Sequence, residues 1–439
     1  MNRYLIISAC CFFLSGRTLA QNKADTLVMG SIQEAISLAV KHNPSQAIYQ
    51  QQILQAKYTY KSVKGGFYPS ASASISGQDN LHLAVTPVPG ELIGKPGTTY
   101  DLQFGKKYNY NTGINLGENI FNWQLLMQTE IAKNNVKLSE LQQDAYVQSL
   151  KEQVARLYYT TLISKASLKT NVKDQLLADS LVILSKQRLH AGTTDEIAVN
   201  QAMINFNNVK QNRAQSQQLY DQGIENLKII LGTKAEDGVV FEEFIQLDSL
   251  SKQNNNWLGN DKNLSVYEQQ EEVAILQSKS QRSVAYPTLS ASAFLGAQQY
   301  RNDFGLSLSS NAWSANRYIG LNLNIPLFTG LTNSNKYKSA VVQQNIAALQ
   351  YTNAKLQSSI NDQLLLKNNE NYLNMVKAAQ RSYILYYNSL MLNRQKFTEG
   401  IITMDVYLKA FQDYLTAENN YLNNLSQLFS IRATILSRQ

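Results

Sequence analysis

Residues 108–117 read YNYNTGINLG, a run of ten in which the character of the side chains alternates strictly. The odd-numbered positions hold only asparagine and glycine, whereas the even-numbered positions hold Tyr108, Tyr110, Thr112, Ile114 and Leu116. Because successive side chains of a strand point to opposite faces, this pattern predicts a β-strand with one apolar and one polar face. About ten residues can cross a bilayer at a tilt. The alternation fits a strand between lipid and water, and it fits a strand of a soluble sandwich equally well.

A similar stretch, YIGLNLNIPL, occupies residues 318–327. Two weaker alternating stretches each follow a Tyr-Pro pair, KGGFYPSASASISG at 64–77 and SVAYPTLSASAFLG at 283–296. The two tyrosines, Tyr68 and Tyr286, are 218 positions apart, which is about half of the 439 residues. The chain therefore contains four candidate strands, arranged as two similar pairs.

Two further landmarks recur in the same order. Phe121 and Phe328 are 207 positions apart, and Gly192 and Gly400 are 208 apart. Each glycine follows some seventy residues without a helix breaker and precedes another long segment, which is typical of a reversal between two helices. Three ordered landmarks at nearly constant spacing predict an internal duplication.

Proline placement permits very long helices. No proline lies between positions 97 and 286 or after Pro326. A helix over residues 122–190 would be roughly 100 Å long at about 1.5 Å per residue. Within it, apolar residues step by three and four as in a coiled-coil seam, at Val147, Leu150, Val154 and Leu157. Helices this long, with polar faces rich in Gln, Asn and Lys, need neighbouring helices or a water-filled interior.

The first twenty residues, MNRYLIISACCFFLSGRTLA, predict a secretory signal peptide with Arg3 at its start and a cleavage site after Ala20. Cleavage before Cys10, with lipidation of that cysteine, is an alternative that would leave a short apolar core. The remaining organisation follows the repeats. The first repeat, 21–231, contains a strand pair within 67–121 and a turn near 192. A linker follows at 232–262. The second repeat, 263–439, contains a strand pair within 284–328 and a turn near 400.

Charge and site composition exclude several classes of function. The formal net charge is +8, of which Arg3 and Arg17 belong to the signal, leaving +6 without a basic block. This gives little support for nucleic-acid binding. The three histidines, His42, His82 and His190, are isolated, and we find no metal-ligand spacing, phosphate loop or nucleophile motif. We therefore expect neither an enzyme nor a cofactor.

Strand number constrains the assembly. Four strands cannot close a membrane barrel, because about eight is the smallest number known. An open sheet edge in lipid would leave backbone groups unpaired at several kcal/mol each. If these strands cross a membrane, several copies of the chain must share one barrel.

Several short motifs, in this order, resemble the TolC family of outer-membrane efflux proteins over essentially the whole mature chain. They are Tyr68-Pro69 and Tyr286-Pro287, Asn119-Ile120-Phe121 and Pro326-Leu327-Phe328, Ala191-Gly192-Thr193-Thr194, and Glu399-Gly400-Ile401-Ile402-Thr403. The resemblance implies a mixed α/β membrane protein, a homotrimer whose chains each give four strands to a twelve-stranded outer-membrane barrel. It also implies a coiled-coil tunnel of twelve helices in the periplasm, and partnership with a periplasmic adaptor (membrane fusion) protein and an inner-membrane transporter.

The resemblance also implies where the functional residues lie. The two glycine turns would form the periplasmic tip that meets the adaptor, with Gly192, Thr193, Thr194, Gly400, Ile402 and Thr403. Members of the family carry acidic residues after the second turn that narrow the pore. Here Asp405 is the candidate for that constriction, although the positions that the family favours correspond to Val406 and Lys409.

Asp195 and Glu196, after the first turn, are further candidates for the constriction. Acidic residues at the start of a helix are also favoured by the helix dipole alone, which is the simpler interpretation of these two.

The expected function is a passive exit duct of the outer membrane, in a tripartite efflux or type I secretion system. A soluble periplasmic coiled-coil scaffold or adaptor is the alternative, which accounts for the helices and leaves the aromatic-flanked strands unexplained.

Overall fold

The computed structural model describes residues 26–242 and 258–439. The predicted signal peptide and Cys10 lie outside these residues, as does the part of the predicted linker at 243–257. Among the helices in the described ranges, none is long and apolar enough to cross a membrane.

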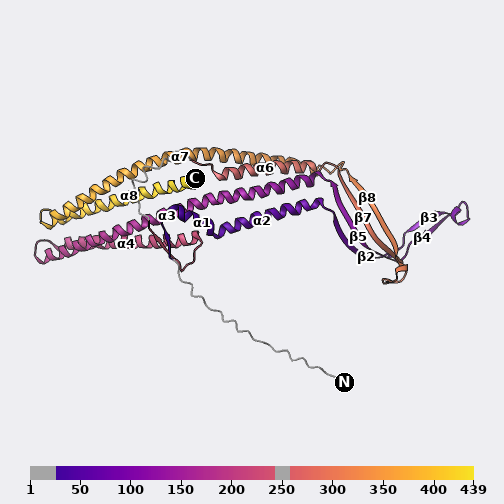
Figure 1. Ribbon diagram of the computed structural model, residues 1–439, viewed down its shortest axis with the longest axis horizontal. Coiled ribbons are helices and arrows are strands. Elements are labelled where there is room, and N and C mark those ends of the chain that lie inside the picture. The colour runs from indigo at the N-terminus through magenta and orange to yellow at the C-terminus, as the bar shows by residue number, and fades with distance from the viewer. Residues whose placement is uncertain (1–25, 243–257) are drawn as a thin grey trace, which may run out of the picture. The chain divides into compact units, whose positions relative to one another are not determined.

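The four predicted strands form one antiparallel sheet in the order β2-β5-β7-β8 (Figure 1). Their bounds are Ser70–Asp79 for β2, Tyr108–Phe121 for β5, Thr288–Arg301 for β7 and Ser314–Asn324 for β8. The central pair consists of the two longer strands, β5 and β7, one from each half of the chain. The two halves are thus joined edge to edge in a single sheet.

Long helices follow each strand pair, as predicted. The helix expected over 122–190 is α3, Trp123–His190, and its counterpart in the second half is α7, Thr332–Thr398. Each is followed by a shorter helix, α4 at Glu196–Leu231 and α8 at Met404–Ser437. The second half begins with α6, Lys262–Ser283.

The stretch before β2 is divided into two helices, α1, Ile32–His42, and α2, Pro44–Lys64. The division occurs at Asn43, whose backbone is extended at ψ 124°. Proline disfavours the helical conformation of the residue before it, which explains the break. Ser31 caps α1, because its side chain accepts a hydrogen bond from the Glu34 amide.

Two short strand pairs were not anticipated. The segment Thr26–Met29 (β1) pairs in parallel with Gly238–Phe241 (β6), inside the region interpreted as a linker. The proline-rich stretch between β2 and β5 contains an antiparallel hairpin, β3 at Val85–Pro89 and β4 at Thr99–Gln103. Pro87 and Pro89 fit there because, among the strands that the structure describes, β3 pairs with β4 alone.

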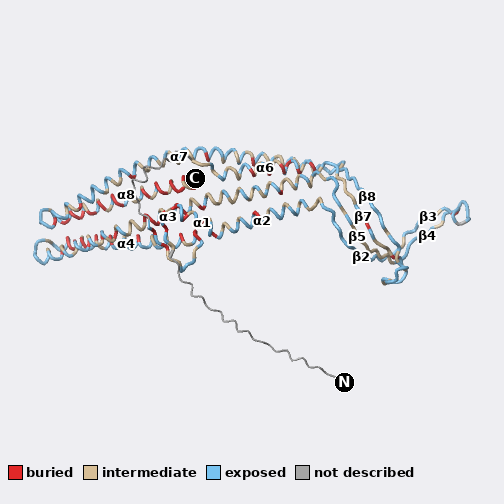
Figure 2. Tube along the Cα trace, viewed as in Figure 1, coloured by how far each residue is buried: buried red, intermediate tan, exposed pale blue. Residues whose placement is uncertain are grey.

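The described residues divide into two compact units, each built from separated stretches. The first contains residues 26–43, 153–242 and 375–430, and the second contains 44–152, 258–374 and 431–439. The first unit has a core between α3, α4, α7 and α8, where Ala202, Leu390 and Phe411 are fully buried. Figure 2 shows buried residues along α4 and α8, whereas in the sheet of the second unit the outer strands β2 and β8 are largely exposed and the central strands β5 and β7 are mostly half-buried or exposed.

Candidate functional site

The strand register confirms that the sheet has two chemically different faces. Ala73 pairs with Ile114, Ile114 pairs with Leu295, and Ala293 pairs with Ile319, which places these side chains on one face. Nothing in the chain's described residues covers this face at Ile75, Ile319 and Leu321, whose side chains are 77%, 86% and 74% exposed. Apolar area of this extent is what lipid or another protein surface would cover.

The other face is polar. Asn115 donates a hydrogen bond from Nδ2 to Ser74 Oγ at 3.0 Å, and Ser70 Oγ donates to the Gly117 carbonyl at 3.1 Å. One aromatic pair lies on this face, Phe294 stacked on Tyr318 with ring centroids 5.7 Å apart. The Phe294 ring lies over Gly113 and Gly296, where an added Cβ would come within 2.6 Å of its Cζ atom. The two glycines therefore let the ring lie close to the sheet.

The outer edges of β2 and β8 have no strand partner within the described residues. The same unit also has an apolar stripe along α7, at steps of three, four and seven residues, with exposed fractions between 42% and 70%. Its members are Val342, Ile346, Leu349, Leu356, Ile360 and Leu364. This spacing is that of a helix face packed against a partner helix.

The first candidate turn, at Gly192, closes α3 with a left-handed glycine at φ +69°. The Gly192 amide donates to the Leu189 carbonyl, and the Thr193 amide donates to the Arg188 carbonyl. This is the Schellman arrangement that a glycine after a helix makes possible. Asp195 then caps α4, because its Oδ1 accepts a hydrogen bond from the Ala198 amide at 2.9 Å.

The second turn, at Gly400, has the same geometry. Gly400 has φ +80°, its amide donates to the Phe397 carbonyl, and the Ile401 amide donates to the Lys396 carbonyl. Thr403 begins the next helix by accepting at its carbonyl from the Tyr407 amide. The duplication recognised in the sequence therefore extends to the same backbone hydrogen bonds at the ends of α3 and α7.

Arg188 connects these two turns, which the sequence does not indicate. Its Nη2 donates hydrogen bonds to the Phe397 and Thr398 carbonyls at the end of α7, and its guanidinium lies 4.2 Å from the centroid of the Phe397 ring. A cation at a helix C-terminus is favoured by the dipole and by the unpaired carbonyls. Phe397 also stacks on Tyr407 of α8 at 5.4 Å.

The three candidate constriction residues are solvent-accessible at the starts of helices. Glu196 is exposed in the first turn of α4, and Asp405 is exposed in the first turn of α8. Lys409, one turn further along α8, is 3.9 Å from Asp413. Asp195, the third candidate, is the exposed N-cap of α4, because its carboxylate accepts a hydrogen bond from the Ala198 amide.

Two buried carboxyl groups lie between α3 and α8 and were not anticipated. Asp174 and Glu418 are 1% and 5% exposed, and Tyr414 donates its hydroxyl to Asp174 Oδ1 at 3.0 Å. Burial raises the pKa of Asp174 to about 6, against the opposing effect of hydrogen bonds from Tyr414 and Glu418. Burial and the charge of Asp174 raise the pKa of Glu418 to about 9. At neutral pH the pair therefore holds one proton.

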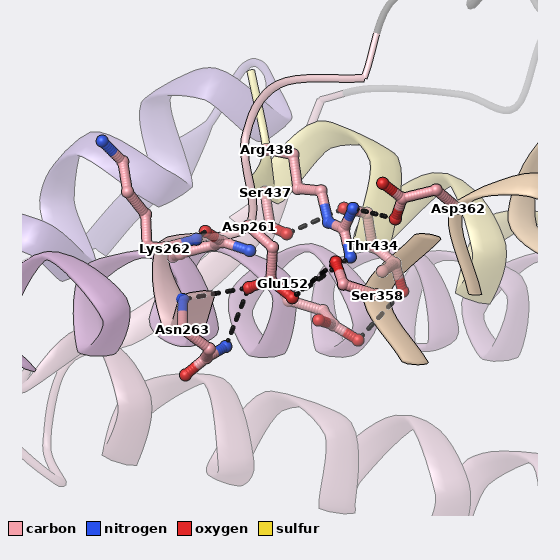
Figure 3. Close-up of polar contacts among 10 residues, drawn as sticks. Glu152, Asp261, Lys262, Asn263, Ser358, Asp362, Thr434, Ser437 and Arg438 are labelled. Atoms are coloured by element: carbon pink, nitrogen blue, oxygen red, sulfur yellow. Dashed lines mark hydrogen bonds and ion pairs between the residues drawn. The ribbon is translucent and has the colours of Figure 1, made fainter. Parts of the chain in front are cut away.

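The second unit has a separate ionic network at the end of the chain (Figure 3). Arg438 forms ion pairs with Asp362 and Asp261, and Ser358 donates to the same Asp261 carboxylate at 3.3 Å. Asp261 is also the N-cap of α6. The network fastens the last helical turn of α8 to α6 and α7.

The described residues contain no group of three or more His, Cys, Asp or Glu side chains that could hold a metal ion. The larger cavities are grooves between helices. One of about 490 Å³, between α3, α4 and α8, has Asn171, Ser216 and Glu418 among its lining residues.

A family model described as outer membrane efflux protein matches residues 35–233 and 255–437. No curated protein sequence matches the chain. Solved structures with the same fold include the CmeC outer membrane channel of Campylobacter jejuni, at 15% identity and a TM-score of 0.73, over 99% of this chain and 93% of that one.

They also include the outer membrane protein VceC of Vibrio cholerae, at 16% identity and a TM-score of 0.72, over 92% of this chain and 94% of that one. The open state of the MtrE outer membrane channel of Neisseria gonorrhoeae is similar at 15% identity and a TM-score of 0.70, over 93% of this chain and 88% of that one.

Proposed function

The chain belongs to the outer membrane efflux protein family, and on that basis we propose that three copies form the exit duct of a tripartite efflux or type I secretion machine. Its place is the outer membrane, with the helical part in the periplasm, and its activity is that of a passive efflux channel rather than an enzyme. The unpaired edges of β2 and β8, beside a bare apolar face, are the observation that carries the proposal.

Strand number favours three copies over two. Two copies would supply eight strands, and the interior of an eight-stranded barrel is filled by its own side chains. Phe294 and Tyr318 on the polar face would occupy that space further. Three copies supply twelve strands, which leaves a lumen for cargo. The apolar stripe on α7 gives the helices a surface with which to contact a second copy.

The polar face of the sheet suits a water-filled lumen, because its asparagine and serine side chains bond to one another and to the backbone. The apolar face suits lipid. Phe121, Trp123 and Tyr286 contact one another near the strand ends that lead into the helices, with ring centroids 6.4 Å apart in both pairs. Such aromatic clusters are typical of the membrane interface.

The two glycine turns are proposed as the periplasmic tip. The residues assigned to adaptor docking are Gly192, Thr193, Thr194, Gly400, Ile402 and Thr403. Opening of the duct would separate the two turns, and Arg188 is the side chain that has to release the α7 carbonyls. The energy for this step would come from the adaptor and an inner-membrane pump.

Extraction of the membrane fraction tests the assembly. The protein should require detergent for release and should have the mass of three chains on native sizing. A soluble scaffold or adaptor, which is the competing function, would stay in the supernatant without detergent. A monomer or dimer in detergent would contradict the three-copy barrel.

Planar-bilayer recordings test the constriction. If three Asp405 carboxylates line the narrowest point, Asp405→Ala should raise the single-channel conductance or change block by cations. Asp221→Ala is the control, because Asp221 is an exposed acid on α4 whose carboxylate accepts a hydrogen bond from Gln217 within the same helix. Equal currents for the two variants would remove Asp405 from the constriction, and Glu196 would be tested next.

A further inference from the structure

The segment that joins β7 to β8, residues 302–313, exposes three large apolar side chains in alternate positions. Phe304, Leu306 and Leu308 are 85%, 49% and 97% exposed. Asp303 is the only charged residue of the segment, whose sequence is NDFGLSLSSNAW. Leu306 and Leu308 are two positions apart in a stretch without a turn, so their side chains share one side. Phe304 is separated from them by a bend at Gly305, whose φ is +112°.

Polar contacts on the opposite side hold this segment in place. Gln299 of β7 donates from Nε2 to the Ser307 carbonyl at 3.2 Å and accepts at Oε1 from the Ser307 amide at 2.9 Å. Trp313 donates from its ring nitrogen to the same carbonyl at 2.8 Å. Gln299 is only 1% exposed beneath the segment. Leu306 and Leu308 therefore lie on either side of Ser307, whose backbone is hydrogen-bonded to the Gln299 side chain of the sheet.

The register shows which face of the sheet the segment adjoins. Gln299 pairs with Tyr110, and Tyr110 belongs to the same row as Thr112 and Ile114 on the apolar face. The Tyr110 hydroxyl accepts a hydrogen bond from the Gly305 amide at 3.0 Å. Phe304 contacts Tyr108, the next residue of that row, edge to face at 5.6 Å. The apolar surface of the segment thus continues the apolar face of the strands.

This end of the strands is opposite to the end that leads into α3 and α7, so in an outer-membrane protein with periplasmic helices it is the external end. We propose that residues 302–313 insert Phe304, Leu306 and Leu308 into the outer leaflet of the outer membrane. Lipid is the occupant that fits, because the surface is apolar, carries one charge and is continuous with the lipid-facing row. The inference rests on the proposed barrel, which puts that row in contact with lipid.

The segment would act as an interfacial anchor at the external rim. Phe304 lies against Tyr108, and the Gly305 amide bonds to the Tyr110 hydroxyl, so aromatic residues gather at this end of the strands as is typical of the membrane–water boundary. The hydrogen bonds to Ser307 keep the segment ordered before it meets lipid, so little conformational freedom is lost on insertion.

Site-directed spin labelling tests the insertion, because both cysteines of the chain, Cys10 and Cys11, lie in the predicted signal peptide. Single variants Phe304→Cys and Leu308→Cys are labelled in lipid vesicles and compared for accessibility to oxygen, which dissolves in lipid, and to a water-soluble nickel chelate. Leu321→Cys on β8 is the lipid reference, and Lys95→Cys at the β3–β4 hairpin is the aqueous reference.

We expect the labels at 304 and 308 to resemble that at 321, with high accessibility to oxygen and low accessibility to nickel. Accessibility like that at 95 would overturn the insertion. Protection from both reagents, with spin–spin broadening between copies, would also overturn it and would assign the surface to a neighbouring chain. Low oxygen accessibility at 321 itself would contradict the barrel, which separates failure of the proposed function from failure of this inference.

Discussion

Replacing Glu418 by glutamine should remove a pH dependence from the contact between α3 and α8. Glu418 and Asp174 are buried together, with the Tyr414 hydroxyl on one Asp174 oxygen. Glutamine has nearly the same shape as a protonated glutamic acid and can donate a hydrogen bond to the other Asp174 oxygen. It cannot lose a proton, so the variant isolates the charge of residue 418 from its packing.

The sign follows from the raised pKa of Glu418, about 9 against an ordinary value of 4.5. Between these values the folded protein holds a proton that the unfolded chain has released. Stability is therefore fully present below about pH 4.5 and is lost as the pH rises towards about 9. One proton corresponds to about 1.4 kcal/mol per pH unit, or a tenfold change in the opening equilibrium.

The groups around the pair do not reverse this sign. A cavity of about 580 Å³ beside Asp174 is lined by Lys173 of α3, Tyr383, Tyr387 and Arg394 of α7, and Tyr414 of α8. The cation on Lys173 lowers the pKa of Asp174, but burial outweighs it. The Arg213 guanidinium of α4 donates a hydrogen bond to the side-chain oxygen of Gln175. Burial also raises the pKa of Tyr383, which keeps that phenol neutral over the same range.

Hydrogen–deuterium exchange of the α3 and α8 segments around residues 174 and 418 measures the effect, after correction for the intrinsic pH dependence of exchange. Protection of the wild type should fall by up to about tenfold per pH unit above neutrality. Glu418→Gln should lose this dependence, whereas the exposed control Glu370→Gln should keep it. The same pH dependence in the wild type and in Glu418→Gln would refute a proton held by this pair.

Four other substitutions have clear expectations. Arg188→Ala removes charge-assisted hydrogen bonds to the end of α7 that contribute about 2 kcal/mol. The open probability of the channel in planar bilayers should therefore rise at least about tenfold. The control Lys186→Ala, at an exposed position, should change it little. Arg438→Met leaves two carboxylates without their cation and should lower the free energy of unfolding, measured in guanidinium chloride, by about 3 kcal/mol. The control Lys409→Met removes an exposed ion pair and should lower it by less than about 1 kcal/mol. Gly400→Ala meets no atom within 4 Å and should cost only about 1–2 kcal/mol of left-handed backbone strain. Gly296→Ala places a Cβ 2.3 Å from the Thr112 carbonyl oxygen and should reduce the yield of folded protein in the membrane far more.

Local pattern alone predicted the elements that repeat. The strict alternation at 108–117 predicted β5 and its two faces, and the absence of breakers predicted α3 within one residue at its start. Gly192 and Gly400 predicted the two turns, because a left-handed position after a helix favours glycine. These features depend on neighbours in the chain, which the sequence displays directly. The break at Asn43 was also readable in principle, since Pro44 carries its own signal.

Contacts between distant segments required the tertiary structure. The pairing of β1 with β6, the burial of Asp174 against Glu418, and the contact of Arg188 with the end of α7 each join residues more than 200 positions apart. None has a local signature, because an Asp on a long polar helix looks the same whether water or a second carboxyl group lies beside it. The sequence by itself determined the repeated strands, the helices and the turns through periodicity and backbone preference. Packing decided which charges were removed from water, and therefore which of them hold a proton or bind across helices.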